Sequence, residues 1–265
     1  MKNKTPLNEV NNKNYEQYMK EVFLGSFWNR WDKELFNKCG DRKYKGNFMP
    51  DIVKNSILRY TNEKELVIDC FGGSGTTIDV CKLFNRKSFV TDLTPSREDI
   101  IEGDAQTFDY PTAKHFILHP PYAGVIKYSE KENDLSNVKN KDKFLIMFEN
   151  VLKNITPKLQ DKGFVTLVIG DYFLNGEYVP LSFYCFELFR EYGYTPKAIC
   201  VKDCADIRNG NRNYKLWCYR NLKFGNYFWQ HEYIMFFKKE IDRRKSKQLT
   251  ELKQLNNWLE KENEN

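Results

Sequence analysis

The stretch that decides the fold runs from Leu66 to Thr77 and reads Leu-Val-Ile-Asp-Cys-Phe-Gly-Gly-Ser-Gly-Thr-Thr. An apolar run ending in Asp69 leads into a glycine-rich turn, and residues 76–84 then carry apolar side chains at helical spacing. This order predicts a strand, a tight turn and a helix. The glycines let the backbone approach a ligand closely, and the helix start offers free N–H groups. The stretch therefore predicts a ligand-binding turn in an α/β protein.

Spacing excludes two common nucleotide-binding motifs at this turn. A phosphate-binding P-loop ends in Gly-Lys-Ser or Gly-Lys-Thr, and no such residues follow Gly75. A dinucleotide fingerprint requires another glycine three residues later, where this chain has Ile78. The turn therefore serves another ligand, or is an ordinary strand-to-helix connection.

Acidic residues close three successive predicted strands. Asp69 ends the first, Asp92 ends the run Ser88–Asp92, and Asp104 follows Ile101. Ligands of open parallel sheets lie beyond the carboxyl ends of the strands. At that edge, Asp92 is expected to accept hydrogen bonds from ribose hydroxyls, and Asp104 is expected to accept one from an adenine amino group. Singly, these acids could be turn or helix-cap residues; their recurrence favours a nucleoside-type ligand.

The tetrapeptide His119-Pro120-Pro121-Tyr122 ends a further apolar strand that begins near His115. Proline cannot continue a ladder and stiffens the chain, so the corner should be rigid. The His119 side chain and the Pro120 carbonyl would offer two acceptors to an amino group, and Tyr122 would stack on a base flipped out of a duplex. The alternative is a strand terminator with a packing tyrosine.

Together these motifs resemble the N6-adenine and N4-cytosine DNA methyltransferases. The cofactor loop of that family reads Asp-Pro-Phe-x-Gly-Ser-Gly-Thr-Thr, and residues 69–77 match it except for Cys70. Its catalytic tetrapeptide is Asp, Asn or Ser followed by Pro-Pro and an aromatic residue, so His119 is a departure. Residues 44–60, 163–171 and 231–238 also resemble family segments, and the resemblance covers roughly residues 42–239.

The resemblance implies S-adenosylmethionine as cofactor and direct methyl transfer to the exocyclic amine of a flipped base. The implied cofactor-binding residues are Phe48, Pro50, Asp69, Phe71, Gly73, Gly75, Thr76, Asp92 and Asp104. The implied catalytic residues are His119, Pro120, Pro121 and Tyr122. No resident metal is expected. The choice between adenine and cytosine, the recognition sequence, a partner restriction endonuclease and the oligomeric state stay open.

The resemblance also implies a doubly wound α/β domain with a seven-stranded sheet, mostly parallel with an antiparallel final strand. We expect an N-terminal helical extension over residues 1–41, with a helix at 15–36, and a catalytic domain over 42–239. A C-terminal helix is expected within 240–265. Loops at 123–142 and 204–230 are expected to contact DNA.

A basic segment over residues 201–230 indicates how DNA would be bound. It contains six Lys or Arg residues against two Asp residues, interleaved with amides and aromatics. Such a mixture suits phosphate and base-edge contacts, and a solvated loop is the alternative. The predicted DNA-binding residues are Arg208, Arg212, Lys215 and Arg220.

Composition sets wider limits. The 265 residues carry 42 basic and 36 acidic side chains, a net charge of +6 that is compatible with nucleic acid. Neither a signal peptide nor a membrane span is visible, and seven cysteines without framework spacing indicate a reducing cytoplasm. Two other functions remain open: methylation of RNA or of a protein amide, and a DNA-binding module that has lost its cofactor.

Overall fold

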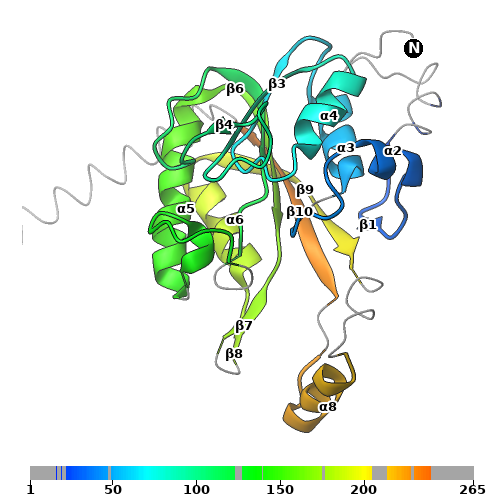
Figure 1. The fold of residues 1–265 in the computed structure, drawn as a ribbon, viewed down its shortest axis with the longest axis vertical. Helices are drawn as coiled ribbons and strands as arrows, with labels where there is room; N and C mark the ends of the chain where they lie inside the picture. Colours follow the sequence, from blue (N-terminus) through cyan, green and yellow to red (C-terminus); the bar gives the residue numbers. More distant parts are fainter. Residues whose placement is uncertain are drawn as a thin grey trace, which may run out of the picture.

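The computed structural model describes residues 16, 19, 22–46, 49–122, 127–138, 140–174, 177–204, 214–227 and 230–239. An eight-stranded sheet in the order β1-β9-β10-β6-β5-β2-β3-β4 divides this part of the chain into two layers of helices (Figure 1). The strands are β1 (Phe27–Trp28), β2 (Leu66–Asp69), β3 (Lys87–Asp92), β4 (Ile101–Glu102), β5 (Ala113–Leu118), β6 (Leu159–Ile169), β9 (Tyr194–Asp203) and β10 (His231–Lys239).

The sheet is parallel except at β10, which runs antiparallel to both β6 and β9. The predicted doubly wound sheet with an antiparallel final strand is therefore confirmed. The predicted number of strands was one too low, because Phe27 and Trp28 pair in parallel with Val201 and Lys202 of β9.

Helices cover both faces of the sheet. One face carries α2 (Lys33–Lys38), α3 (Pro50–Tyr60) and α4 (Thr76–Leu83), and the other carries α5 (Lys141–Ile155) and α6 (Leu181–Glu191) (Figure 1). The apolar faces of these helices form two buried clusters. The first joins α5 and α6 to the sheet through residues such as Phe148 and Phe189, and the second joins α3 and α4 through Ile57 and Val80.

The N-terminal segment is not the continuous helix predicted for residues 15–36. Its described part contains β1 and the short helix α2, and Trp28 is only 3% exposed. The Trp28 ring packs against Phe23 and Phe236, because burying it on the sheet edge removes more apolar surface from water than a solvent-facing helix would. This segment therefore completes the second buried cluster.

Two elements extend beyond the carboxyl edge of the sheet: the hairpin of β7 (Tyr172–Leu174) with β8 (Glu177–Val179), and α8 (Tyr214–Phe224) (Figure 1). The segment 204–230, predicted as a loop, therefore contains a helix. Residues 214–224 contain neither Gly nor Pro, the two residues that most disfavour a helix, so the helical hydrogen bonds run through this stretch without interruption. The C-terminal segment 240–265 lies outside the described residues.

The described part of the chain contains no helix that is long and apolar enough to cross a membrane. The same part contains no group of three or more His, Cys, Asp or Glu side chains arranged to hold a metal ion. The cysteines in it are thiols, all buried except Cys218.

Candidate active site

The glycine turn between β2 and α4 depends on backbone conformations that favour glycine. Gly73 has φ of 49° and Gly75 has φ of 80°, both in the left-handed region. Gly75 is also the N-cap of α4, so the helix starts directly at the end of the turn. A side chain at either position would strain the turn, which explains the Gly-x-Gly spacing.

Asp69 supports this turn from beneath. Its buried carboxylate accepts bonds from the Phe71 N–H at 2.9 Å and from the Thr77 hydroxyl at 2.5 Å. Burial raises the pKa of Asp69 to about 6, while these two bonds act in the opposite direction. Asp69 therefore shapes the turn without facing the cavity beside it.

Asp92 joins the end of β3 to the same turn. Its carboxylate accepts bonds from the N–H groups of Gly73 and Thr94, both at 2.8 Å. Gly72 donates its N–H to the Thr91 carbonyl at 2.8 Å. Burial raises the pKa of Asp92, and the nearby Asp134 carboxylate adds to the effect. The third acid, Asp104, accepts bonds from the Gln106 N–H at 2.9 Å and the Asn133 amide at 2.7 Å.

The tetrapeptide follows β5 directly, with Pro120 buried and His119 half-buried. The Tyr122 hydroxyl lies 3.5 Å from His119 Nε2, and the two rings meet edge to face with centroids 6.1 Å apart. Burial lowers the pKa of His119 to about 4; Glu232 opposes this shift and Lys202 adds to it. His119 is therefore neutral near pH 7 and can accept a hydrogen bond through one ring nitrogen.

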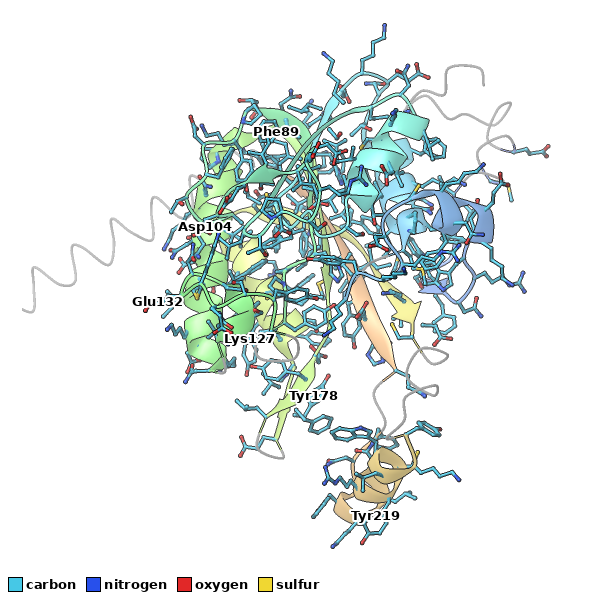
Figure 2. The ribbon with its side chains drawn as sticks, viewed as in Figure 1. Phe89, Asp104, Lys127, Glu132, Tyr178 and Tyr219 are labelled. Atoms are coloured by element: carbon cyan, nitrogen blue, oxygen red, sulfur yellow. The ribbon has the colours of Figure 1, made fainter. Side chains whose placement is uncertain are left out.

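One cavity of about 210 Å³ connects these features. It brings together the predicted residues Phe71, Gly73, Asp92, Asp104, His119, Pro120, Pro121 and Tyr122. Figure 2 shows Asp104 in front of α5, above the connection that carries Lys127 and Glu132. The glycine turn and the tetrapeptide, which are separate in the sequence, thus line one common space.

Other predicted site residues do not line this cavity. Asp69, Gly75 and Thr76 are buried in the supporting turn, and Pro50 is buried at the start of α3. Phe48 lies outside the described residues.

Several polar or aromatic side chains of the cavity wall were not predicted, among them Tyr44, Tyr128, Asn133, Asp134, Lys202 and Glu232. The rings of Tyr44 and Tyr128 stack at 6.3 Å with an interplanar angle of 22°. Tyr128 and Asn133 belong to the long connection 123–142, whose length was a signal of function. Lys202 was noted only as part of the basic segment 201–230 and Glu232 only as part of the segment 231–238. Neither was predicted to line the site, because only the pairing of β9 with β10 brings them together.

The two described residues of the predicted DNA-binding set do not line the cavity. Lys215 and Arg220 lie exposed on α8, whereas Arg208 and Arg212 lie outside the described residues. Helix α8 buries none of its side chains and exposes Trp217 and Tyr219. Figure 2 shows Tyr219 on this helix, well below the sheet, and Tyr178 on the β7–β8 hairpin above it.

Comparison with known proteins supports the resemblance. Residues 1–103 match the model of the N6/N4 methyltransferase family, which is described as DNA methylase. A segment of 79 residues is 34% identical to the type II methyltransferase M.MjaII of Methanocaldococcus jannaschii; it makes up 30% of this chain and 15% of that protein. These two findings confirm the resemblance to the DNA amino-methyltransferases. The tetrapeptide lies beyond the residues that match the family model.

Similar solved structures include TrmN from Thermus thermophilus, with 13% identity and a TM-score of 0.45, covering 74% of this chain and 50% of that one. A putative DNA modification methylase, also from Thermus thermophilus, shares 17% identity with a TM-score of 0.36, covering 52% and 51% of the two chains. A precorrin-6Y C5,15-methyltransferase from Geobacter metallireducens GS-15 shares 12% identity with a TM-score of 0.45, covering 78% and 96%.

Proposed function

We propose that this protein binds S-adenosylmethionine in the cavity and transfers its methyl group to the exocyclic amine of a base flipped out of duplex DNA. One observation carries the proposal: the turn that ends β2 and the tetrapeptide that ends β5 line the same cavity. A methyl donor on the first and an amine on the second would meet within it. The family match supports DNA as the substrate class.

Chemistry assigns the cofactor to the side of the cavity formed by the glycine turn. Carboxylates that already accept backbone N–H bonds keep further acceptor sites, since each ionised carboxylate has about four lone-pair positions. Asp92 would accept the ribose hydroxyls and Asp104 the adenine amino group. The cofactor supplies an electrophilic methyl group on a positively charged sulfur.

The target base is assigned to the tetrapeptide side. Its exocyclic nitrogen is a weak nucleophile, because its lone pair is delocalised into the ring. The neutral imidazole of His119 and the Pro120 carbonyl would each accept one N–H, which favours a localised lone pair. Tyr122 would stack on the base, and unstacking from the duplex is the cost that this contact offsets.

DNA contact is assigned to the basic segment that precedes β10. Helix α8 within this segment carries Lys215, Arg220 and Lys223 and contains no acidic residue. The Arg220 guanidinium lies 5.7 Å from the centroid of the Trp217 ring. Exposed cations beside aromatic rings suit a phosphate backbone and unstacked bases, and they favour DNA over a protein amide.

The test is transfer of labelled methyl from S-adenosylmethionine to duplex DNA, tRNA and protein in parallel. We expect label in DNA alone, recovered as N6-methyladenine or N4-methylcytosine, with the site located by sequencing modified DNA. Tyr122→Ala should reduce the rate strongly, because a stacked base is worth about 1–3 kcal/mol, and Tyr122→Phe should retain most of it.

Label in tRNA or protein would replace DNA as the substrate. Calorimetry gives the remaining outcome: a protein that binds DNA but not S-adenosylmethionine would be a binding module rather than an enzyme.

A further inference from the structure

The sheet topology brings a buried ion pair to the tetrapeptide. Because β10 is antiparallel to the strands around it, its first residues lie at the edge where β5 and β6 end. The last residues of β9 reach the same edge, and Glu232 of β10 stands opposite Lys202 of β9. Both side chains line the cavity together with His119 and Tyr122.

The pair is tight and nearly dry. Lys202 Nζ lies 2.6 Å from Glu232 Oε2, and the two side chains are 6% and 14% exposed. Removing two charges from water costs several kcal/mol per ion, so such a pair is weak evidence for a purely stabilising role. Its position on a cavity wall, instead of inside the apolar clusters, favours a chemical role.

The amine site described so far lacks a negative charge. Neutral His119 accepts one hydrogen bond through one nitrogen, and a backbone carbonyl carries only a partial charge. During methyl transfer the amine nitrogen becomes positive. An anion fixed beside it would stabilise that charge where it develops.

We propose that Glu232 is the anionic group of this site, sharing with His119 the target N–H that the Pro120 carbonyl does not accept, and that Lys202 is the positioning residue that holds it there. This inference rests on the proposed function. The glutamate supplies, from β10 on the other side of β6, the negative charge that His119 does not supply at the first position of the tetrapeptide.

The amine lone pair forms the new C–N bond while the methyl carbon leaves sulfur, whose bonding electron pair stays on sulfur. The amine, now positively charged, loses one N–H proton along its hydrogen bond to a Glu232 carboxylate oxygen. From there the proton passes to solvent, and the product is a neutral methylamino group.

The test compares Glu232→Gln with wild type in single-turnover methylation. Glutamine keeps the shape and loses the charge, so we expect the rate to fall about 100-fold, the size found on removing one preorganised group that stabilises developing charge. Affinity for S-adenosylmethionine should stay within about twofold, because the cofactor lies on the other side of the cavity. Glu149→Gln, which breaks the Lys153–Glu149 pair on the surface of α5, is the matched control and should leave the rate unchanged.

A binding experiment separates a contact with the amine from a structural effect. Duplexes carrying the target base are compared with duplexes in which an analogue without the amino group replaces it. Wild type and Glu149→Gln should prefer the amino base, whereas Glu232→Gln should lose about five- to tenfold of that preference, because glutamine keeps a neutral acceptor and loses only the charge-assisted part of the hydrogen bond.

The pH profile tests Lys202. The titratable side chains lining this cavity are Tyr44, Cys70, Asp92, Asp104, His119, Tyr122, Tyr128, Asp134, Lys202 and Glu232. The Lys202 charge lowers the pKa of His119 and Glu232 raises it. The methylation rate should fall at low pH, where His119 becomes protonated. Lys202→Met should therefore move this acidic limb of the pH–rate profile to higher pH, and Glu232→Gln should move it to lower pH. Lys202→Arg should keep the wild-type limb.

Each outcome decides the inference. Glu232→Gln methylating within about twofold of wild type, or losing cofactor affinity together with rate, would overturn it. Should Lys202→Met fail to fold, the double variant with Glu232→Gln removes the unpaired charge and should reproduce the Glu232→Gln rate. If wild type methylates no DNA, the proposed function fails first; if wild type is active and Glu232→Gln equals it, the inference alone fails.

Discussion

Asp92 holds the cofactor turn and faces the cavity with the same carboxylate. Asp92→Ala should weaken S-adenosylmethionine binding by about 1.5–3 kcal/mol, the range for bonds to a charged group. Part of that loss would come from the freed Gly73 N–H, which now donates to Asp92. Calorimetry measures the affinity for S-adenosylmethionine, and Asp109→Ala, at an exposed position, is the control. The affinity for DNA without cofactor should stay constant. Unaltered cofactor affinity would remove Asp92 from the ribose site.

His119 sets the expected pH dependence at the residue scale. Its pKa is lowered to about 4, so the imidazole becomes a donor only in strongly acidic solution. Methyl transfer should therefore show no His119-dependent loss between about pH 5.5 and 8.5, although an unperturbed histidine would titrate near 6.5 within that window. His119→Asn should keep most activity and His119→Ala should lose most of it.

Single-turnover rates across that window give the measurement. A limb near pH 6.5 that disappears in His119→Asn would mean that the histidine is more solvated than its position indicates. A His119→Ala enzyme with the wild-type rate would make the tetrapeptide a strand terminator only.

At the scale of elements, α8 is the described helix of the segment proposed to bind DNA. Replacing Lys215 and Arg220 by Ala should weaken DNA binding across sequences. The slope of log affinity against log salt should become shallower by about one per lost phosphate contact. Lys33→Ala with Lys38→Ala, on α2, is the matched control, because that helix packs on the opposite end of the molecule from α8 (Figure 1).

Fluorescence anisotropy with labelled duplexes at several salt concentrations measures the slope. A changed sequence preference at constant slope would indicate base readout by α8. If the α2 control changes the slope as much as the α8 variant does, the effect of α8 comes only from the net charge of the protein.

At the scale of the whole molecule, a buried histidine makes stability depend on pH. His115 is fully buried in the sheet, with Nε2 3.0 Å from the Thr166 hydroxyl, and burial lowers its pKa to about 3. The unfolded chain, with an ordinary histidine near 6.5, binds a proton that the folded state does not. Stability is therefore highest above about pH 6.5 and falls as the pH drops toward the folded-state value.

His115→Gln should make this fall shallower by up to about 1.4 kcal/mol per pH unit, the slope for one proton. Asp69 acts with the opposite sign, because its pKa is raised to about 6 and its contribution is lost as the pH rises. The difference in the free energy of unfolding between wild type and His115→Gln isolates the contribution of His115. Urea unfolding at pH 7.5, 6 and 5 measures the free energy of unfolding. If it changes equally with pH in wild type and His115→Gln, the prediction is contradicted.

Local patterns carried most of the fold. The apolar run before Asp69, the glycine turn and the helical spacing after it are short-range features, and they became β2, the turn and α4. The strand ending in His119-Pro120 was readable for the same reason, since proline ends a ladder whatever surrounds it. The N-terminal strand β1 was missed, because two residues form a strand only when a distant edge is available to pair with them.

For the site, the sequence by itself was enough to predict residues that belong to a short local pattern: the turn glycines, the strand-end acids Asp92 and Asp104, and the tetrapeptide. Only the tertiary structure decided which of them face one cavity and which, such as Asp69, support it from beneath. It also decided the Lys202–Glu232 pair, whose members lie on separate strands. The physical reason is that strand pairing, and not chain proximity, brings residues together at the edge of a sheet, and burial there then sets their charge states.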